Sequence, residues 1–409
     1  MSDGWFTLFT NCRYCLNGEL VEDHLVISDD NGTILKRTGY IGGEVVDLED
    51  GIIAPGFLEL QTNGVNGFHF THFENEQQYE KKLEDTAKYY VTQGVTGFWA
   101  TVPTVAEAEF KKILPSLKPR EFTNSASLLG AHAEGPYLFP AKKGAHNASL
   151  FHTPSTPPSS IYGASNLPTI KLATIAPELP NSSALIQQLT ATGTRVSLGH
   201  SSATYAQGLS ALNAGATALT HTLNAMSGLQ SREPGLAGLI GLPSTATAPP
   251  APFYSLIPDG QHLHPATLSL LHRAHPRRSI LVTDSIELAG LPDGVYAGHA
   301  QIAARQRKTG PRATIEGTDT LIGGCVSLQE GVHNLMRWSG CGIAEAVACV
   351  TENVAGLMGI DGPGGRGVLR EGRRADLCVL SDEGEVLQTW VAGRKVWDRE
   401  DELAKREES

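Results

Sequence analysis

IKLATIAPELPNSSALIQQLTATGTRVSLGH, residues 170–200, has the pattern that best indicates the fold class of this chain. The stretch begins with the apolar run IKLATIA and ends with RVSLGH, and both runs are typical of strands. Between them, Leu185, Ile186 and Leu189 recur at the spacing of one helix face. The order strand, helix, strand is typical of a parallel sheet covered by helices.

The same alternation continues on both sides of this unit. Eight strand-like runs lie at 57–61, 95–102, 127–134, 170–176, 195–200, 216–221, 253–259 and 279–284. Residues at helical spacing lie between several of these runs: Tyr79, Leu83 and Tyr90; Phe110, Ile113, Leu114 and Leu117; and Leu268 with Leu271. Eight strands with helical crossovers predict an α/β fold, a parallel (β/α)8 TIM-like barrel, with a doubly wound open sheet as the alternative.

Both ends of the chain have a different, period-two pattern. LVISDDNGTILKR at 25–37 contains the turn signal Asp-Asn-Gly, and the sequence at 367–397 alternates short apolar runs with Gly turns. Because the termini of a domain often lie close together, we expect the two ends to pair and form one small β domain.

Three further segments interrupt these patterns. Residues 151–168 are rich in Pro and Ser and predict a surface insertion without a helix, and 302–320 predict a second polar excursion. The charge run DREDELAKREES at 398–409 predicts a frayed, solvated tail.

The composition excludes several classes of protein. A formal net charge of −11 over 409 residues argues against binding to nucleic acid or to an anionic membrane. The sequence contains neither an apolar run long enough to span a membrane nor an N-terminal signal pattern, so we expect a soluble, cytoplasmic protein. Six scattered cysteines are too few for a disulfide framework, and the pair Cys12 and Cys15 is expected to be structural.

The most informative polar residues are those that end apolar runs. Glu134, His200, His221 and Asp284 each terminate one of the predicted strands. In a TIM-like barrel the carboxyl ends of the strands meet at one face, and active sites are built there. We therefore expect these four side chains to lie together.

These residue types indicate metal-dependent chemistry. One carboxylate and two imidazoles suit zinc or a similar divalent ion and leave coordination positions open for water and substrate. Asp284, in the apolar context SILVTDS, is the candidate general base. A fourth metal ligand or a helix N-cap is the alternative role for Asp284.

Loops after the strands add candidate substrate contacts. These are Asn224, the backbone of Ala225 and Arg232 after the sixth strand, Asp259, His262 and His264 after the seventh, and His146 after Glu134. Arg suits bidentate recognition of phosphate, and one of the imidazoles is expected to contact the substrate. His69 and His72 end no predicted strand and are expected to be structural.

Taken in order and spacing, nine segments closely resemble the N-acetylglucosamine-6-phosphate deacetylase family of the amidohydrolase superfamily. They are APGFLELQTNGVNG at 54–67, HAEGPYL at 132–138, KKGAHN at 142–147, SLGHSSATY at 197–205, THTLNAM at 220–226, REPGLAG at 232–238, PDGQH at 258–262, LVTD at 281–284 and GRGVLREGRRADLCVL at 365–380. The resemblance covers nearly the whole chain.

The resemblance implies a metal-dependent barrel over 55–360 and a β-sandwich formed by 1–54 together with 361–409, the latter including the polar tail. It also implies hydrolysis of the acetamide of N-acetyl-D-glucosamine 6-phosphate to D-glucosamine 6-phosphate and acetate, in amino-sugar catabolism or recycling. In relatives some phosphate contacts cross a dimer interface, so the resemblance implies a homodimer.

The resemblance also implies roles for individual residues. Glu134, His200 and His221 match metal ligands, and Asp284 matches the catalytic acid/base. Substrate-binding positions are matched by Ala145, His146, Asn224, Ala225, Arg232, Asp259, His262, Leu321, Ile322 and Gly323. Within this set, His146 is the catalytic candidate that polarises the acetyl carbonyl, and residues 321–323 form the wall near the acetyl group.

Departures from the superfamily pattern limit the metal content. Many amidohydrolases carry His-x-His after the first strand and bind two metals, whereas this chain has Gln61-Thr62-Asn63. We therefore expect one divalent ion per chain, with zinc the first choice. Three alternatives stay open: hydrolysis of a different amide, hydrolysis of an unphosphorylated acetamido sugar, and a non-catalytic scaffold.

Overall fold

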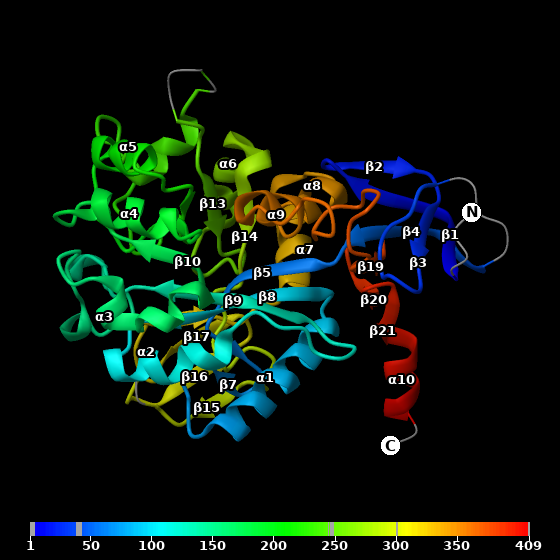
Figure 1. Cartoon of the computed structure of the whole chain (residues 1–409), viewed down its shortest axis with the longest axis horizontal. Helices are drawn as coiled ribbons and strands as arrows, with labels where there is room; N and C mark the ends of the chain where they lie inside the picture. The colour runs from blue at the N-terminus through cyan, green and yellow to red at the C-terminus, as the bar shows by residue number, and fades with distance from the viewer. Residues whose placement is uncertain (1–4, 38–42, 244, 246–248, 300–301, 408–409) are drawn as a thin grey trace.

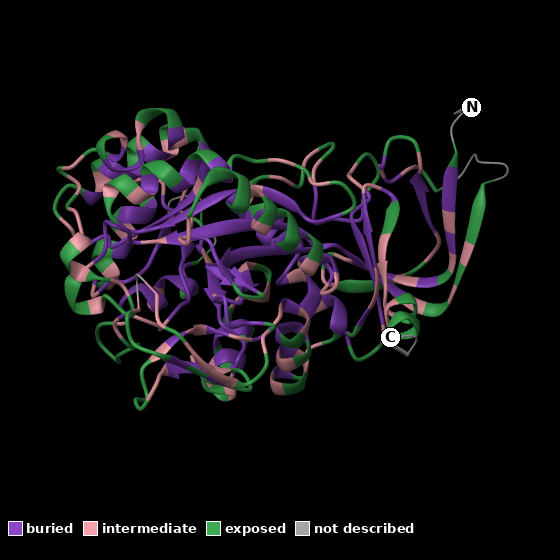
Figure 2. Cartoon of the chain, turned by 90° about the horizontal axis from the view of Figure 1, so that it is seen from below, coloured by how far each residue is buried: buried purple, intermediate pink, exposed green. Residues whose placement is uncertain are grey.

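The structure is a computed structural model, shown in Figure 1, and describes residues 5–37, 43–243, 245, 249–299 and 302–407. A large α/β unit contains most of the chain, and a smaller β unit contains residues from both of its ends. Buried strands run through the middle of the large unit, while the helices around them expose one face to solvent (Figure 2).

Eight parallel strands form the centre of the large unit. They are β5 (Phe57–Thr62), β8 (Val95–Pro103), β9 (Ser127–Glu134), β10 (Ile170–Ile175), β11 (Arg195–Leu198), β12 (Ala218–Leu219), β13 (Phe253–Leu256) and β14 (Ser279–Leu281), hydrogen-bonded in this order. At the end of β5, Thr62 forms a parallel bridge with Ser285, which follows β14, and the Asp284 N–H donates to the Gln61 carbonyl at 2.9 Å. These contacts close the sheet, and the predicted TIM-like barrel is confirmed.

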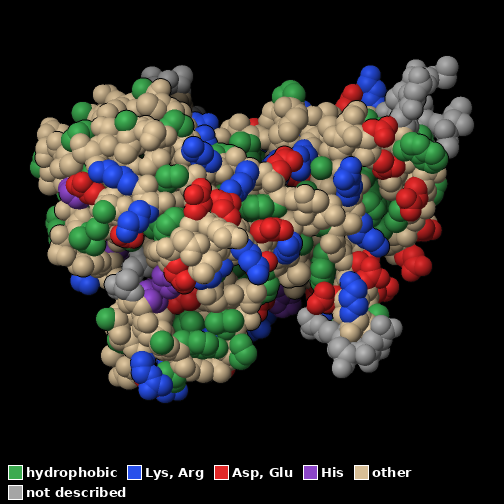
Figure 3. Space-filling view, turned by 60° about the horizontal axis from the view of Figure 1, so that its bottom comes forward, with side chains coloured by type: hydrophobic (Ala, Val, Ile, Leu, Met, Phe, Trp, Pro, Cys, Tyr) green, Lys and Arg blue, Asp and Glu red, His purple; other side chains and the backbone are tan. Residues whose placement is uncertain are grey.

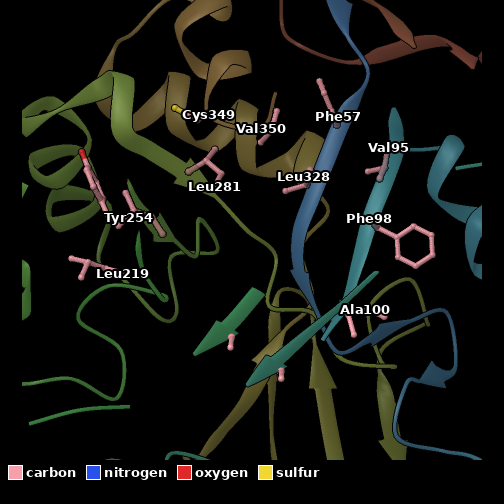
Figure 4. Close-up of a cluster of buried hydrophobic side chains, with 14 of the residues drawn as sticks. Phe57, Val95, Phe98, Ala100, Leu219, Tyr254, Leu281, Leu328, Cys349 and Val350 are labelled. Carbon is pink, nitrogen blue, oxygen red and sulfur yellow. The ribbon is translucent and has the colours of Figure 1, made fainter. Parts of the chain in front are cut away.

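Helices cover the outside of the barrel. They are α1 (Glu76–Val91), α2 (Glu107–Ile113), α4 (Ser182–Ala191), α5 (Tyr205–Asn213), α6 (Pro265–Ala274), α7 (Leu328–Ser339), α8 (Ile343–Ala348) and α9 (Glu352–Met358). Helix α1 illustrates why: the Asn75 side chain caps its first turn by accepting the Gln78 N–H, and Tyr79, Leu83 and Tyr90 are buried along one face. The helices bury such faces against the strands, in a core where Phe57 and Phe98 lie with Leu281 and Val350 (Figure 4).

The smaller unit is one seven-stranded sheet drawn from both ends of the chain. It contains β1 (Phe6–Leu16), β2 (Glu19–Glu22), β3 (Leu25–Ser28), β4 (Glu44–Pro55), β19 (Leu377–Leu380), β20 (Val386–Val391) and β21 (Arg394–Asp398). The two ends meet where β4 pairs antiparallel with β19, with Ala54 opposite Cys378. The predicted pairing of the two ends is therefore confirmed.

Two of the predictions for irregular segments are wrong. Residues 151–168 contain a short helix, α3 (Pro158–Tyr162), because Ile161 and Tyr162 are buried and the Tyr162 ring packs edge-on against Phe110, at 5.0 Å between centroids. The charged tail forms α10 (Arg399–Glu407), whose first turn carries Glu400, Asp401 and Glu402. Acidic residues at that end stabilise a helix through its dipole, so the charge run favours a helix without a buried face.

The second polar excursion contributes to a four-stranded antiparallel sheet. This sheet contains β15 (Gly294–Tyr296), β16 (Gln306–Thr309), β17 (Arg312–Ile315) and β18 (Leu321–Gly324). A separate two-stranded sheet contains β6 (Gly64–Val65) and β7 (Phe68–His69). The Gly324 N–H donates to the Asp284 carbonyl at 2.8 Å. The four-stranded sheet is thereby joined to the end of the last barrel strand.

The distribution of charge on the surface and the state of the cysteines match what the composition indicates. Acidic and basic side chains are interspersed over the face shown in Figure 3. All six cysteines have free thiols, and Cys12 and Cys15 are buried. No helix in the described part of the chain is both long enough and apolar enough to span a membrane.

Candidate active site

A cavity of about 440 Å³ opens where the barrel strands end. Its wall includes Glu134, His200, His221 and Asp284, so the four side chains that end predicted strands do lie together. A larger cavity, of about 720 Å³, has residues of α1 and α7 in its wall and contains none of these four residues. The chemistry-bearing residues are therefore concentrated in the smaller cavity.

Three of these side chains converge on one point. Oε1 of Glu134 lies 2.9 Å from Nε2 of His221 and 3.2 Å from Nε2 of His200, and the two nitrogens are 3.1 Å apart. Each of the three residues is at most 4% exposed. One carboxylate oxygen and two imidazole nitrogens, directed at one point, form a donor set that suits zinc or a similar divalent ion.

The backbone directs these side chains inward. His200, His221 and Asp284 have φ values of 48°, 29° and 44°, in the left-handed region that residues other than glycine rarely adopt. Such conformations cost free energy and are concentrated at functional sites. The strain is located where the chain turns out of three different barrel strands.

The hydrogen-bond partners of His200 favour a metal-binding tautomer. Its Nδ1 donates to the carbonyl of Lys142 at 2.8 Å, which leaves the lone pair of Nε2 facing Glu134. Burial lowers the pKa of His200 to about 4, so the imidazole is neutral near pH 7. A neutral imidazole held by its second nitrogen is the form that ligates metals.

The carboxylate of Glu134 is ionised despite its burial. Burial opposes ionisation, but the neighbouring imidazoles, with His221 in hydrogen-bond contact, outweigh it and hold the pKa of Glu134 well below its usual value. For His221, burial lowers the pKa, and the hydrogen bond to Glu134 outweighs that effect and raises it to about 9. The 2.9 Å contact between Glu134 and His221 brings together two donor atoms that a divalent cation could bind in place of the shared proton.

Two amide side chains explain how the departure from His-x-His is accommodated. The Gln61 amide donates to Glu134 at 3.1 Å and to Oδ1 of Asp284 at 3.2 Å, and the Asn63 amide donates to the same Asp284 oxygen at 2.9 Å. The residues at the end of the first strand therefore hold the carboxylates and supply no imidazole to the site.

Asp284 has the environment of a proton-transfer group. Burial raises the pKa of its carboxyl group, and repulsion from Glu134 raises it further. No helix begins after Asp284, since residues 285–293 are described and contain none, so the N-cap alternative is wrong. A carboxyl group with a raised pKa beside a metal-binding cluster is suited to general acid and base catalysis.

His146 presents a hydrogen-bond donor to the cavity. The Thr104 N–H donates to Nδ1 of His146 at 3.3 Å, so the neutral ring carries its proton on Nε2. That nitrogen is 3.7 Å from the second oxygen of Glu134, and the ring lies 4.6 Å from that of His200. The cavity therefore has an N–H donor beside the metal-binding cluster.

Most of the predicted substrate-binding residues line the cavity. They are Ala145, His146, Asn224, Ala225, His262, Leu321, Ile322 and Gly323. The amide nitrogen of Asn224 is buried without a hydrogen-bond partner, so it is free to donate to a ligand.

Asp259, Arg232 and His264 lie outside this wall. The buried carboxylate of Asp259 accepts from Nδ1 of His262 at 2.6 Å and orients that ring. Arg232 is exposed. Nδ1 of His264 accepts the Ala266 N–H at the start of α6.

The structure adds cavity residues that the sequence patterns did not indicate. His69 was expected to be structural, and it lines the cavity together with His299 and Ile286. His72 packs against both imidazoles, with ring centroids 5.1 Å from His69 and 4.6 Å from His299, and lies outside the cavity wall. The signal for His69 was its position at the end of the two-residue strand β7, which is too short to be recognised in the sequence.

The chain is similar in sequence to proteins of known function. No profile of a known protein family matches the chain. An N-acetylglucosamine-6-phosphate deacetylase from Danio rerio is 35% identical over 97% of this chain and 98% of its own length. An N-acetylgalactosamine-6-phosphate deacetylase from Escherichia coli O157:H7 is 31% identical over 88% of this chain and 97% of its own length.

A solved structure is also similar over nearly the whole chain. A mutant N-acetyl-D-glucosamine-6-phosphate deacetylase from Mycobacterium smegmatis, in complex with N-acetyl-D-glucosamine-6-phosphate, has a TM-score of 0.82 and 26% sequence identity. The match covers 96% of this chain and 100% of the other. Similarity to amidohydrolases implies a divalent metal, and Glu134, His200 and His221 are suited to hold it.

Proposed function

Because this chain belongs to the N-acetylglucosamine-6-phosphate deacetylase family of the amidohydrolase superfamily, we propose that it hydrolyses the acetamide of N-acetyl-D-glucosamine 6-phosphate. The products are D-glucosamine 6-phosphate and acetate, and the reaction serves amino-sugar catabolism or recycling. The observation that supports this proposal best is the convergence of Glu134, His200 and His221 beside Asp284 in one cavity.

We propose that Glu134, His200 and His221 hold one zinc ion per chain. Their nitrogen and oxygen donors fit zinc, and Gln61 and Asn63 offer amides where a second metal would need imidazoles. When bound, such an ion supplies Lewis acidity, which polarises a carbonyl oxygen and makes a water molecule more acidic.

Asp284 moves the proton in this mechanism. Its carboxylate accepts a proton from the attacking water, and Gln61 and Asn63 hold it in place through Oδ1. The protonated carboxyl then donates to the departing amine, which needs the proton because an amide anion is a poor leaving group.

His146 stabilises the developing oxyanion. Its Nε2–H donor is fixed by the hydrogen bond from Thr104 to Nδ1, and it faces the cavity beside the donor cluster. A donor that is oriented before the reaction stabilises the charge on the acetyl oxygen without a reorganisation cost.

The remaining wall residues position the sugar phosphate. Asn224 offers its unpartnered amide and Ala225 its backbone, while His262 is held by Asp259. Residues 321–323 form the wall near the acetyl group. These contacts are proposed from their place in the cavity and from the family resemblance.

Arg232 fits this scheme in a homodimer. Its side chain is exposed and lies outside the cavity wall of its own chain. We propose that the protein is a cytoplasmic homodimer in which Arg232 reaches the phosphate bound by the partner subunit. A charged donor from the partner would complete a site that otherwise offers the phosphate few cations.

The experiment that tests this function is acetate release from N-acetylglucosamine 6-phosphate, with zinc determined on the same sample. Unphosphorylated N-acetylglucosamine and N-acetylgalactosamine 6-phosphate are measured in parallel. Turnover of N-acetylglucosamine 6-phosphate with at least about one zinc per chain supports the proposal.

The other outcomes favour specific alternatives. Faster turnover of the galactosamine epimer would assign the activity that the E. coli relative is named for. Equal turnover of the unphosphorylated sugar would remove the phosphate from the recognition. No turnover of any of the three sugars by the zinc-loaded protein would contradict the proposal.

A further inference from the structure

A second group of metal-binding side chains lies outside the cavity, among the helices that cover the barrel. His272 is in the last turn of α6, Cys341 is in the connection between α7 and α8, and Glu345 is in the first turn of α8. In the part of the chain that the structure describes, this group and the group of Glu134 are the two in which three donor atoms all lie within 4.8 Å of one another.

The donor spacing resembles that at the candidate active site. Nε2 of His272 lies 2.9 Å from Oε1 of Glu345, the same distance that separates His221 and Glu134. The sulfur of Cys341 lies within 4.8 Å of both partners. Small side-chain movements bring three such donors to the separations found around a tetrahedral ion.

The local backbone holds the donors in place. Gly340, with φ of 74°, ends α7, and Gly342 is the N-cap of α8, so Cys341 is fixed in a short turn. Cys341 and Glu345 are four residues apart, across the start of the helix. The ring of His272 is fully buried against them.

A further sulfur orients the imidazole. Sγ of Cys349 lies 3.8 Å from Nδ1 of His272, on the side of the ring opposite Glu345. Metal-binding imidazoles usually have a hydrogen-bond partner at the second nitrogen. The neighbouring cation, Arg273, donates to the Ser339 carbonyl.

We propose that His272, Cys341 and Glu345 form a second, structural metal site for zinc or a similar thiophilic divalent ion. One thiolate, one carboxylate and one neutral imidazole carry two negative charges, which balance a divalent cation. Sulfur and nitrogen donors favour zinc over magnesium or calcium. Binding displaces the thiol proton of Cys341 to solvent, and water completes the coordination.

The site would join two elements that are distant in the sequence. α6 packs against α7, and α7 packs against α8, on the outside of the barrel (Figure 1). A bound ion would cross-link the end of α6 to the α7–α8 corner. None of its three ligands lines the catalytic cavity, so its role is stability.

Cobalt(II) distinguishes the two sites, because only this one contains a thiolate. Metal-free full-length protein is titrated with Co²⁺ while thiolate-to-cobalt charge-transfer absorption is followed in the near ultraviolet. We expect two bound cobalt ions per chain and a charge-transfer band that belongs to the second site. One bound ion without the band would overturn the proposal.

Variants assign the band to residues. Cys341→Ser should lose the band and the second ion while keeping the first ion. The d–d absorption of cobalt at the first site then reports that the fold is intact. Glu345→Gln should weaken binding of the second ion by about tenfold or more. Cys325→Ser, which removes the other partly exposed thiol, is the matched control and should keep the band. Persistence of the band in Cys341→Ser would contradict the assignment.

Discussion

The two sides of the proposed active site are built in different ways. On one side, Glu134 ends β9, and His200 and His221 follow β11 and β12 by two residues. These three side chains are nearly inaccessible to solvent and lie 2.9–3.2 Å apart. On the other side, Arg232 lies on an exposed loop and outside the cavity wall. The barrel alone assembles the proposed metal-binding side, whereas the phosphate side depends on loops and, in the proposed dimer, on a second subunit.

The two sides differ because the backbone positions of their residues are constrained to different degrees. A side chain at the end of a barrel strand is fixed by the register of that strand with both neighbours. A residue on a surface loop has no such register, and its position depends on what packs against the loop. Substitutions should therefore affect chemistry on the first side and substrate affinity on the second.

The largest effect is expected for Asp284→Asn. The variant keeps the shape of the site but cannot accept a proton, so kcat should fall by about a thousandfold. Zinc content should not change, because Asp284 is outside the three-donor group. Acetate release and metal analysis on one sample check both statements. Retained turnover in a zinc-loaded sample would contradict the role of Asp284.

The next effect concerns His146, which lies on a loop but faces the metal-binding side. Loss of an oxyanion donor in His146→Gln should lower kcat by about a hundredfold, with a smaller change in KM. His152→Gln, in the following loop, is the control and should behave like the unmodified protein. An equal loss of activity in both variants would indicate damage to the loop and not loss of a donor.

A smaller effect is expected on the phosphate side. Arg232→Ala should raise KM for N-acetylglucosamine 6-phosphate by about ten- to a hundredfold and leave kcat nearly unchanged, since a hydrogen bond from a charged group is lost. Arg277→Ala, an exposed arginine just before β14 and so at the opposite end of the barrel, is the control. If Arg232→Ala leaves KM unchanged, Arg232 does not contribute to the phosphate side of the site.

A mixed dimer tests which subunit Arg232 acts on. Combining Asp284→Asn subunits with Arg232→Ala subunits should restore one functional site per heterodimer if Arg232 acts on the partner subunit. Absence of any restored affinity would place Arg232 in its own subunit or outside the site.

The smallest effect is expected on stability. It concerns the pH dependence of the free energy of unfolding that arises from the buried carboxyl group of Glu59. Burial raises the pKa of Glu59 to about 8, above the value of about 4.5 expected in the unfolded chain. The unfolded state therefore binds fewer protons than the folded state between these values, and folding stability falls as pH rises towards 8. Glu59→Gln should remove this loss.

Urea unfolding at pH 6 and pH 8.5 checks the prediction. Relative to the unmodified protein, Glu59→Gln should gain about 1–3 kcal/mol in free energy of unfolding when the pH is raised. The same difference between the two proteins at both pH values would mean that Glu59 is already ionised in the fold.

Sequence patterns predicted the barrel and the cluster of polar residues at its strand ends because both depend on the order of apolar and polar residues along short stretches of the chain. Each of the eight apolar runs contains a strand, and the fold brings together the polar residues that end four of these runs. The cavity wall was less predictable. His299 precedes β16 by several residues and reaches the cavity only through the antiparallel sheet, a long-range arrangement that no local pattern reveals.

Local patterns also misjudged two helices. α3 is short and rich in Pro and Ser, and it forms because Ile161 and Tyr162 find a buried surface supplied by α2. α10 lacks the apolar stripe that identifies a helix in a sequence, and its charges favour the helix instead. In neither case did the periodicity of apolar residues reveal the helix.

Because β4 pairs with β19, the smaller sheet is completed only late in synthesis on the ribosome. β4 can pair with β1 early, but its second edge is covered only by Leu377–Leu380, after the whole barrel has been translated. Until then that edge presents unpaired N–H and C=O groups, which other nascent chains can join. Completion of translation therefore closes the sheet, and a chain that terminates before Leu377 is left with an edge prone to aggregation.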